Sequence, residues 1–149
     1  MITIYSSDST GVRGNCLYPY QHEVTDAAGL REAVRHDYVC AEYKGNYRSG
    51  GNFVTSNCLG MDCDNDHTDH EHEWITPDDV RRNFPDVPLA IHFSRHHMKP
   101  KDQKSARPRF HCLFAIEPTT DVKAYADMKA RLNALFPYFD AQALDGARF

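Results

Sequence analysis

The alternation of apolar and polar residues predicts three helices along the chain. Residues 25–37 have helical spacing behind a Thr25 or Asp26 cap. Residues 76–84 begin with Pro77 in the first turn and stop at Pro85. The longest pattern spans residues 119–136, with Thr119 or Thr120 as the cap and Pro137 as the stop. Its apolar stripe consists of Val122, Tyr125, Leu132, Leu135 and Phe136.

Four segments rich in β-branched and aromatic residues predict strands, at 38–43, 52–64, 87–95 and 107–117. The last two are joined by a basic loop and are expected to form an antiparallel pair. The order helix, strand, strand, helix, strand, strand, helix predicts an α+β fold. In this fold a mostly antiparallel sheet is covered by helices.

Alternate residues of a strand share a face, and this rule predicts where the polar side chains lie. Asp62 and Asp64 face one way, and the apolar residues Leu59, Met61 and Cys63 face the other. Arg109 and His111 lie together, opposite Phe110, Cys112 and Phe114, and Ser94 shares a face with His92. Each strand is therefore expected to have an apolar face for the helices and a polar face for chemistry.

Length and composition place limits on the class of protein. The 149 residues match one domain, 1–149. Five cysteines at irregular spacings argue against a disulfide framework. No apolar run is long enough for a membrane span, and the first residues do not resemble a signal peptide, so a cytoplasmic protein with no membrane partner is expected. The net charge of −4 does not by itself indicate a nucleic-acid binder.

The local charge distribution changes this picture. Residues 62–79 contain eight acids and no Lys or Arg, whereas residues 95–109 contain six Lys or Arg and one acid, Asp102. Each alone is typical of a solvated loop. Together, an acidic cluster that collects divalent cations and a basic cluster that collects phosphates favour a nucleotide-handling site. Asp62 and Asp64, about 6–7 Å apart along a strand, are suited to bridge Mg²⁺ or Mn²⁺, with Asp140 as a candidate third ligand.

Three motifs in the chain resemble those of a known superfamily. "LGMDCD" (59–64), "RPRFHCLF" (107–114) and "YFDAQALDGAR" (138–148) are similar in order and spacing to the motifs of the archaeo-eukaryotic primases and primase-polymerases. The details look most like primases of bacterial mobile elements and phages. The resemblance covers roughly residues 38–149 and implies an RRM-like catalytic palm.

The resemblance also implies roles for individual residues. Asp62, Asp64 and Asp140 would be catalytic and hold two Mg²⁺ or Mn²⁺ ions, and His111 would contact the phosphates of the incoming nucleotide. Further nucleotide-binding candidates, from charge, position or motif, are Arg109, Arg107, Ser94 and Arg148. Many relatives carry Ser where this chain has Arg109, so the pattern of phosphate contacts departs from the family there.

The implied activity is a template-directed nucleotidyl transfer. A primer or an initiating nucleotide on single-stranded DNA would attack the α-phosphate of an NTP or dNTP and release pyrophosphate. A helicase or another replication domain would be a partner. If Asp140 points away from the other two acids, Asp145 would take its role. Tyr43, Lys44, Tyr47 and Arg48 are candidates to grip the template.

Three other functions remain open from the residues. Asp62, Asp64, Asp66 and Glu73 match positions 1, 3, 5 and 12 of a calcium-binding EF-hand loop, but His67 replaces the glycine and a strand precedes the loop. His67, His70 and His72 with Cys58 or Cys63 are potential zinc ligands without a recognised spacing. A rolling-circle nicking endonuclease shares a similar sheet but requires a His-hydrophobic-His strand motif, which is not found here.

Overall fold

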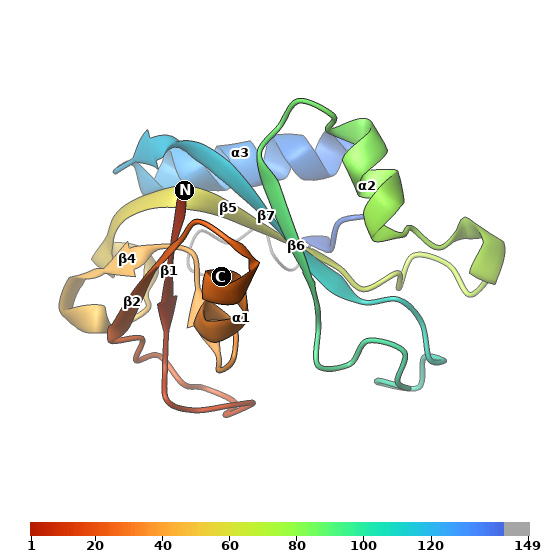
Figure 1. Ribbon diagram of the computed structural model, residues 1–149, viewed down its shortest axis with the longest axis horizontal. Helices are drawn as coiled ribbons and strands as arrows, with labels where there is room; N and C mark the ends of the chain where they lie inside the picture. Colours follow the sequence, from red (N-terminus) through yellow and green to blue (C-terminus); the bar gives the residue numbers. More distant parts are fainter. Residues whose placement is uncertain (142–149) are drawn as a thin grey trace.

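The protein is a mixed α+β fold whose computed structural model describes residues 1–141. Within these residues two antiparallel sheets are formed (Figure 1). The first sheet has the order β2-β1-β3 and consists of β1 (Ile2–Ser6), β2 (Tyr20–Val24) and β3 (Tyr38–Val39). Helix α1 (Ala27–Ala33) lies between β2 and β3 in the chain. The second has the order β4-β5-β7-β6 and contains β4 (Glu42–Tyr43), β5 (Phe53–Cys63), β6 (Leu89–Phe93) and β7 (Phe110–Thr119).

The other two helices accompany the second sheet. Helix α2 (Pro77–Asn83) begins at a capping box, in which Thr76 and Asp79 satisfy each other's backbone N–H groups. Helix α3 (Val122–Leu135) is capped by Asp121, whose carboxylate accepts from the N–H groups of Lys123 and Ala124. The predicted Thr119 or Thr120 cap is therefore wrong, because the aspartate follows closely and reaches two backbone donors. Residues 1–141 also contain the 3₁₀ turns η1 (Lys44–Asn46), η2 (Gly50–Asn52) and η3 (Glu71–Glu73).

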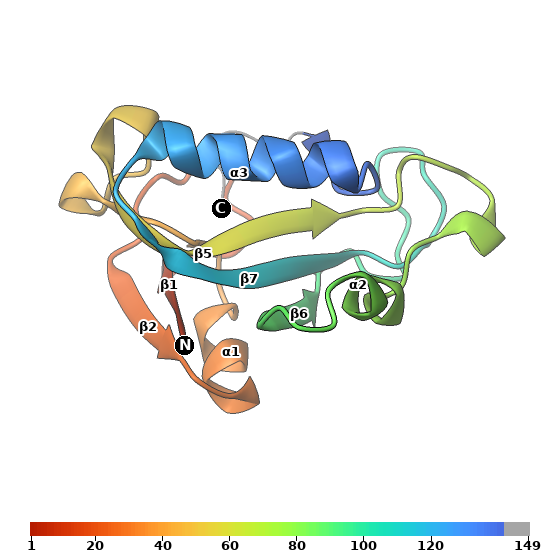
Figure 2. The same ribbon diagram turned by 90° about the horizontal axis from the view of Figure 1, so that it is seen from above.

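One face of the second sheet packs against α2 and α3. Alternate residues of β5 and β7 form this core together with Val80 of α2 and Tyr125 of α3: Leu59, Met61, Cys63, Phe110, Cys112 and Phe114. Helix α3 runs along β5 and β7 (Figure 2). The predicted apolar face is thus confirmed. Leu135, placed on the apolar stripe of α3, is instead 74% exposed because it lies in the last turn of the helix.

The opposite face of the second sheet is partly covered, which the sequence did not predict. Cys58 and Leu113 pack there against Ile2 and Ile4 of β1 and against Ala33 of α1. The β1, β2 and α1 unit lies on the side of β5 and β7 away from α3 (Figure 2). The end of this face around Asp62 and His111 carries polar groups.

The predicted strand over residues 38–43 is wrong in detail. It divides into β3, which pairs with β1, and β4, which pairs with β5. The buried residues Cys40 and Ala41 link the two sheets. The segment passes from one sheet to the other, so its apolar residues serve two cores.

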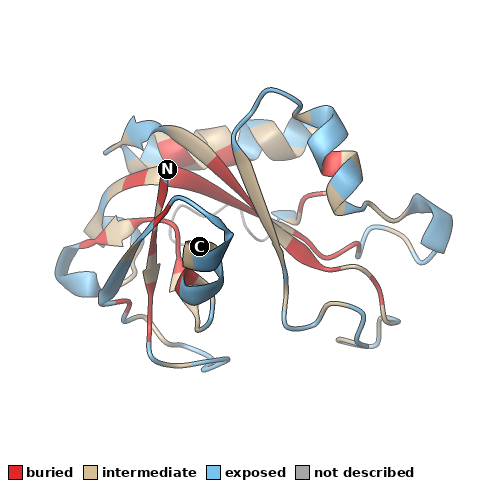
Figure 3. Ribbon diagram, viewed as in Figure 1, coloured by how far each residue is buried: buried red, intermediate tan, exposed pale blue. Residues whose placement is uncertain are grey.

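Burial is concentrated along β5 and β7, whereas α1 and η3 are exposed on their outer sides (Figure 3). The polar end of the second sheet is therefore supported by a well-packed core, on which a site can be built. Among the described residues, no helix has the length and apolar character needed to cross a bilayer.

Candidate functional site

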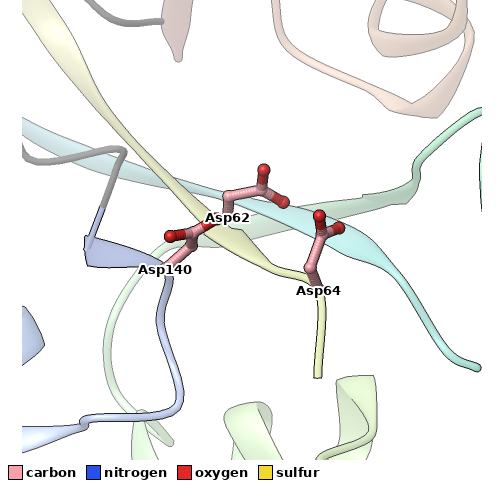
Figure 4. A group of neighbouring side chains, drawn as sticks. All are labelled: Asp62, Asp64 and Asp140. Carbon is pink, nitrogen blue, oxygen red and sulfur yellow. The ribbon is translucent and has the colours of Figure 1, made fainter. Parts of the chain in front are cut away.

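Three aspartates gather where β5 ends. Asp62 is the penultimate residue of β5, Asp64 follows its end, and Asp140 comes from the turn after α3. The backbone N–H of Asp140 donates to the carbonyl of Asp62 at 2.8 Å, which ties the two segments together. One carboxylate oxygen from each aspartate lies within 4.8 Å of the others (Figure 4). The structure therefore brings together the three acids that the sequence singled out.

The charge of this acid cluster, Asp62, Asp64 and Asp140, is poorly compensated at Asp62. Burial, together with the nearby charges of Asp64 and Asp140, raises the pKa of Asp62 to about 8. Its Oδ1 is buried and has no hydrogen-bond partner among the described residues. A divalent cation would satisfy this oxygen and remove the repulsion, and three carboxylates form a donor set that fits a hard divalent cation.

A row of polar side chains continues from the acid cluster across the sheet. Asp62 of β5 is opposite His111 of β7, which is opposite His92 of β6. His111 Nε2 lies 3.6 Å from Asp62 Oδ1. Burial and the charges of His92, Arg95 and Lys101 lower the pKa of His111 to about 3, so the ring is neutral at physiological pH.

Tyr38 of β3 reaches this row from the first sheet. Its hydroxyl lies 2.7 Å from His92 Nε2 and 2.6 Å from His111 Nδ1. Burial raises the pKa of Tyr38 well above its usual value, so the hydroxyl keeps its proton. Sequence reasoning missed this residue, because nothing in the "YVCAEY" segment signals a partner 54 or 73 positions later.

The basic loop 95–109 is largely engaged with the acidic stretch 62–79. Lys101 Nζ donates to Asp64 Oδ2 at 2.6 Å. Arg109 is fully buried, with Nε 3.6 Å from Asp64 Oδ1 and a terminal nitrogen donating to Asp66 at 3.2 Å. The two opposed charge patches therefore neutralise each other over much of their length.

Arg107 holds the acidic loop in the same way. It is 1% exposed and donates to the carbonyls of Asn65 and Thr68 and to the carboxylate of Asp69. Its guanidinium also stacks over the Trp74 ring, 5.3 Å from the centroid. The sequence made Arg107 and Arg109 candidates to bind a triphosphate, but both guanidinium groups are buried against the loop that they fix.

Other cations surround a cleft on the far side of His111. The cleft has a volume of about 530 Å³, within the usual range for small-molecule sites. It is lined by four arginines, Arg13, Arg35, Arg48 and Arg95, and by a single acid, Asp37. Tyr38, His92 and His111 form its inner wall, and Ser94, a predicted nucleotide-binding residue, also lines it. We refer to it as the arginine cleft.

Asp37 shapes the arginine cleft. Its carboxylate accepts from the backbone N–H groups of Gly11 and Val12 and pairs with Arg95 at 2.8 Å. Gly11 has φ +71°, a conformation that favours glycine. The signal that sequence reasoning passed over is the "STGVRGN" segment, 9–15, where two glycines flank an arginine.

The remaining predicted residues have varied positions. Arg148 and Asp145 lie outside the described residues. Tyr43 is buried at 4% exposure in the core, so it cannot stack on a template base, whereas Arg48 lines the arginine cleft. Within residues 1–141, the acid cluster is the one group of three or more His, Cys, Asp or Glu residues suited to a metal.

The rival sites are not assembled in this part of the chain. The 3₁₀ turn η3 carries Glu73, whose carboxylate accepts from Thr68, and strand β5 stands where an EF-hand has a helix. Cys58 and Cys63 are buried in separate cores, while His70 and His72 are exposed. For a nicking reaction, burial raises the pKa of Tyr38, which is the opposite of activating a nucleophile.

Comparison of the chain with protein-family models, curated proteins and solved structures finds no match. Function must therefore be argued from the geometry. An acid cluster suited to divalent cations lies on one side of His111, and a cleft rich in arginine lies on the other. This arrangement can bind a polyanion with its reactive end near metal ions.

Proposed function

We propose that the protein is a metal-dependent nucleotidyltransferase that adds NTPs or dNTPs to a primer or an initiating nucleotide on a single-stranded DNA template. One observation carries the proposal: the acid cluster and the arginine cleft meet at His111. Phosphoryl transfer depends mainly on positioning and on charge stabilisation, and these two features supply both. A primase or primase-polymerase is the specific form of the proposal, since the three motifs resemble that superfamily.

Asp62, Asp64 and Asp140 would hold Mg²⁺ or Mn²⁺. When bound, such ions stabilise the charge on the attacking and leaving oxygens of the transfer. The chain itself prepares the cluster, because Lys101 and Arg109 fix the carboxylate of Asp64. The bond from the Asp140 N–H to the Asp62 carbonyl fixes the third segment against β5.

The arginine cleft would hold the triphosphate. Four guanidinium groups against one carboxylate give a net positive lining, and guanidinium forks match phosphate oxygens in geometry. Arg95 is already oriented by Asp37, and Arg48 by the carbonyl of Asn15 and the ring of Tyr18. These residues replace Arg107 and Arg109 in the predicted phosphate-binding role.

The order of elements supports an RRM-like palm. The succession β5, α2, β6, β7, α3, with spatial order β5-β7-β6 and both helices on one face, matches the first five elements of such a βαββαβ palm. The acid cluster and His111 lie at one end of its two central strands, β5 and β7. A helicase or another replication domain remains a proposed partner on the strength of the resemblance alone.

The test is incorporation of labelled nucleotides on single-stranded DNA with Mn²⁺ or Mg²⁺. The Asp62→Asn, Asp140→Asn double variant should be folded and inactive. Asp86→Asn, an exposed aspartate away from the cluster, should match the wild type. Asp64 is a poorer choice than the sequence suggested: it is 6% exposed and paired with Arg109, so its removal would also destabilise the fold. Equal incorporation by the double variant and the control would refute the proposal.

A further inference from the structure

The hydroxyl of Tyr38 takes part in two short hydrogen bonds but has a single proton. It lies 2.7 Å from His92 Nε2 and 2.6 Å from His111 Nδ1. A tyrosine hydroxyl can donate one hydrogen bond and accept others. It therefore donates to at most one of the two rings, and its oxygen must accept an N–H from the other. Once the tautomer of one ring is known, the position of every proton in this group of three side chains follows.

A contact with the backbone determines which ring nitrogen of His92 carries the proton. Its Nδ1 lies 3.2 Å from the carbonyl oxygen of Phe93. A carbonyl oxygen only accepts, so Nδ1 of His92 carries the proton. Burial lowers the pKa of His92, which keeps the ring neutral and leaves the lone pair on Nε2. The Tyr38 hydroxyl then donates to His92 Nε2, and its oxygen accepts from His111 Nδ1–H.

This chain of hydrogen bonds determines which nitrogen of His111 faces the acid cluster. We propose that Tyr38 is a positioning residue that keeps the proton of His111 on Nδ1, so that the lone pair of Nε2 is directed towards Asp62. Nε2 is the nitrogen 3.6 Å from Asp62 Oδ1. His111 is thereby set to accept a proton or to donate its lone pair to a cation. In this tautomer Nε2 cannot donate to a phosphate oxygen, which limits the form of the phosphate contact that the family resemblance implies for His111.

The geometry has a precedent in the general chemistry of metal sites. A histidine that binds a metal through one nitrogen normally donates its other N–H to an oxygen, which fixes the ring and its tautomer. Here that oxygen is the Tyr38 hydroxyl, itself anchored through His92 to a backbone carbonyl. Because Tyr38 belongs to β3, the first sheet contributes to the site by controlling a residue of the second. The tautomer of His111 is independent of the proposed function, and only the binding of a cation by Nε2 rests on it.

The tautomers can be measured without any metal or nucleotide. Long-range ¹H–¹⁵N correlation spectra of the full chain with ¹⁵N-labelled histidine distinguish a protonated ring nitrogen from one with a lone pair. The wild type should show Nδ1–H for both His92 and His111. Nε2–H at His111 in the metal-free wild type would overturn the proposal.

Two variants test the direction of the hydrogen bonds. Tyr38→Phe removes the acceptor for His111 Nδ1–H, and His92→Leu leaves the Tyr38 proton available to His111 Nδ1. Both should shift His111 towards Nε2–H, the tautomer that free imidazole side chains favour in water. Tyr138→Phe is the matched control, because the Tyr138 hydroxyl accepts a hydrogen bond from the side-chain amide of Asn83. An unchanged His111 tautomer in both folded variants would also overturn the proposal.

Titration with Mn²⁺ alone then separates this proposal from the proposed function. Loss of an orienting partner typically lowers metal affinity about 10- to 100-fold. Tyr38→Phe should show such a loss, and Tyr138→Phe should not. If the wild type binds no Mn²⁺, the proposed metal site is refuted, and the spectra of the metal-free protein still test the role of Tyr38. If Mn²⁺ binds wild type and Tyr38→Phe equally, the metal site stands and the orienting role is refuted.

Discussion

At the scale of single residues, Asp62 should lower the stability of the metal-free protein as pH rises. The pKa of Asp62 is raised from 3.8 to about 8 in the folded state. Between these values the unfolded chain has lost this proton while the folded chain keeps it, so rising pH favours unfolding. Asp62→Asn, which cannot ionise, should therefore raise the Tm more at pH 8 than at pH 5 relative to wild type. Equal shifts in Tm at the two pH values would contradict this account of Asp62.

A bound divalent cation should remove the loss of stability that ionised Asp62 causes in the folded protein. Protons compete with the cation for the Asp62 carboxylate, so added Mn²⁺ should raise the Tm more at pH 8 than at pH 5. At a concentration of 100 times Kd, the stabilisation would be about 2.7 kcal/mol. Thermal unfolding with and without Mn²⁺ measures the effect. Asp86→Asn should retain it, and a shift that survives in Asp62→Asn would place the ion elsewhere.

Arg107 and Arg109 should prove to be structural residues. Arg107→Ala leaves the carbonyls of Asn65 and Thr68 without their donor, and an unsatisfied buried acceptor costs about 1–3 kcal/mol. Lys104→Ala, which removes an exposed ion pair to the same Asp69, should cost less than about 1 kcal/mol. Urea unfolding compares the two. A smaller loss in Arg107→Ala than in Lys104→Ala would show that Arg107 does not hold the loop.

At the scale of elements, the start of α2 offers a clean test of the fold. Thr76→Ala removes the hydroxyl that accepts from the Asp79 N–H and donates to the Asp79 carboxylate, and it keeps the reciprocal hydrogen bond from its own backbone N–H. The expected cost is about 0.5–2 kcal/mol of unfolding free energy. Thr120→Ala is the control, since Thr120 is exposed and Asp121 caps the neighbouring helix. Similar values for the two variants would contradict the assigned caps.

Most of the elements could be predicted from periodicity, but not how they associate. The β5 and β7 strands and all three helices follow from regular apolar spacing over several residues. Strand β2 was missed because it is polar and mostly exposed, so it carries little apolar signal. Strand β1 does carry an alternating apolar pattern, with Ile2 and Ile4 buried, and was passed over because of its short length. The division of residues 38–43 was missed because short strands in two sheets have the same apolar character as one longer strand.

At the scale of the whole molecule, the arginine cleft should determine nucleotide affinity. A charge-assisted hydrogen bond contributes about 1.5–3 kcal/mol, and about 1.4 kcal/mol corresponds to a tenfold change in affinity. Arg13→Ala and Arg48→Ala should each weaken triphosphate binding by about 10- to 150-fold, measured by calorimetry. Arg31→Ala, on the exposed surface of α1 outside the cleft, should leave the affinity unchanged. If all three variants bind equally, the triphosphate does not occupy this cleft.

The residues of the candidate site that belong to a sequence motif could be predicted. Those that tertiary structure brings to the site from outside the motifs could not. Asp62, Asp64 and Asp140 converge as the motifs indicated. Tyr38 and Arg13 come from the first sheet and its loop, where no motif points to the site. Charge counting along the chain could not predict how the cations are oriented, because Arg107 and Arg109 are close to His111 in sequence but turn towards the acidic loop.

The most direct test of the central claim is a crystal structure with Mn²⁺ and a non-hydrolysable nucleoside triphosphate, using the anomalous signal of manganese. The account predicts manganese bound by Asp62, Asp64 and Asp140, with the triphosphate extending from it past His111 into the arginine cleft. Manganese held by Asp64, Asp66 and Glu73 instead, or a triphosphate bound away from the four arginines, would contradict the account.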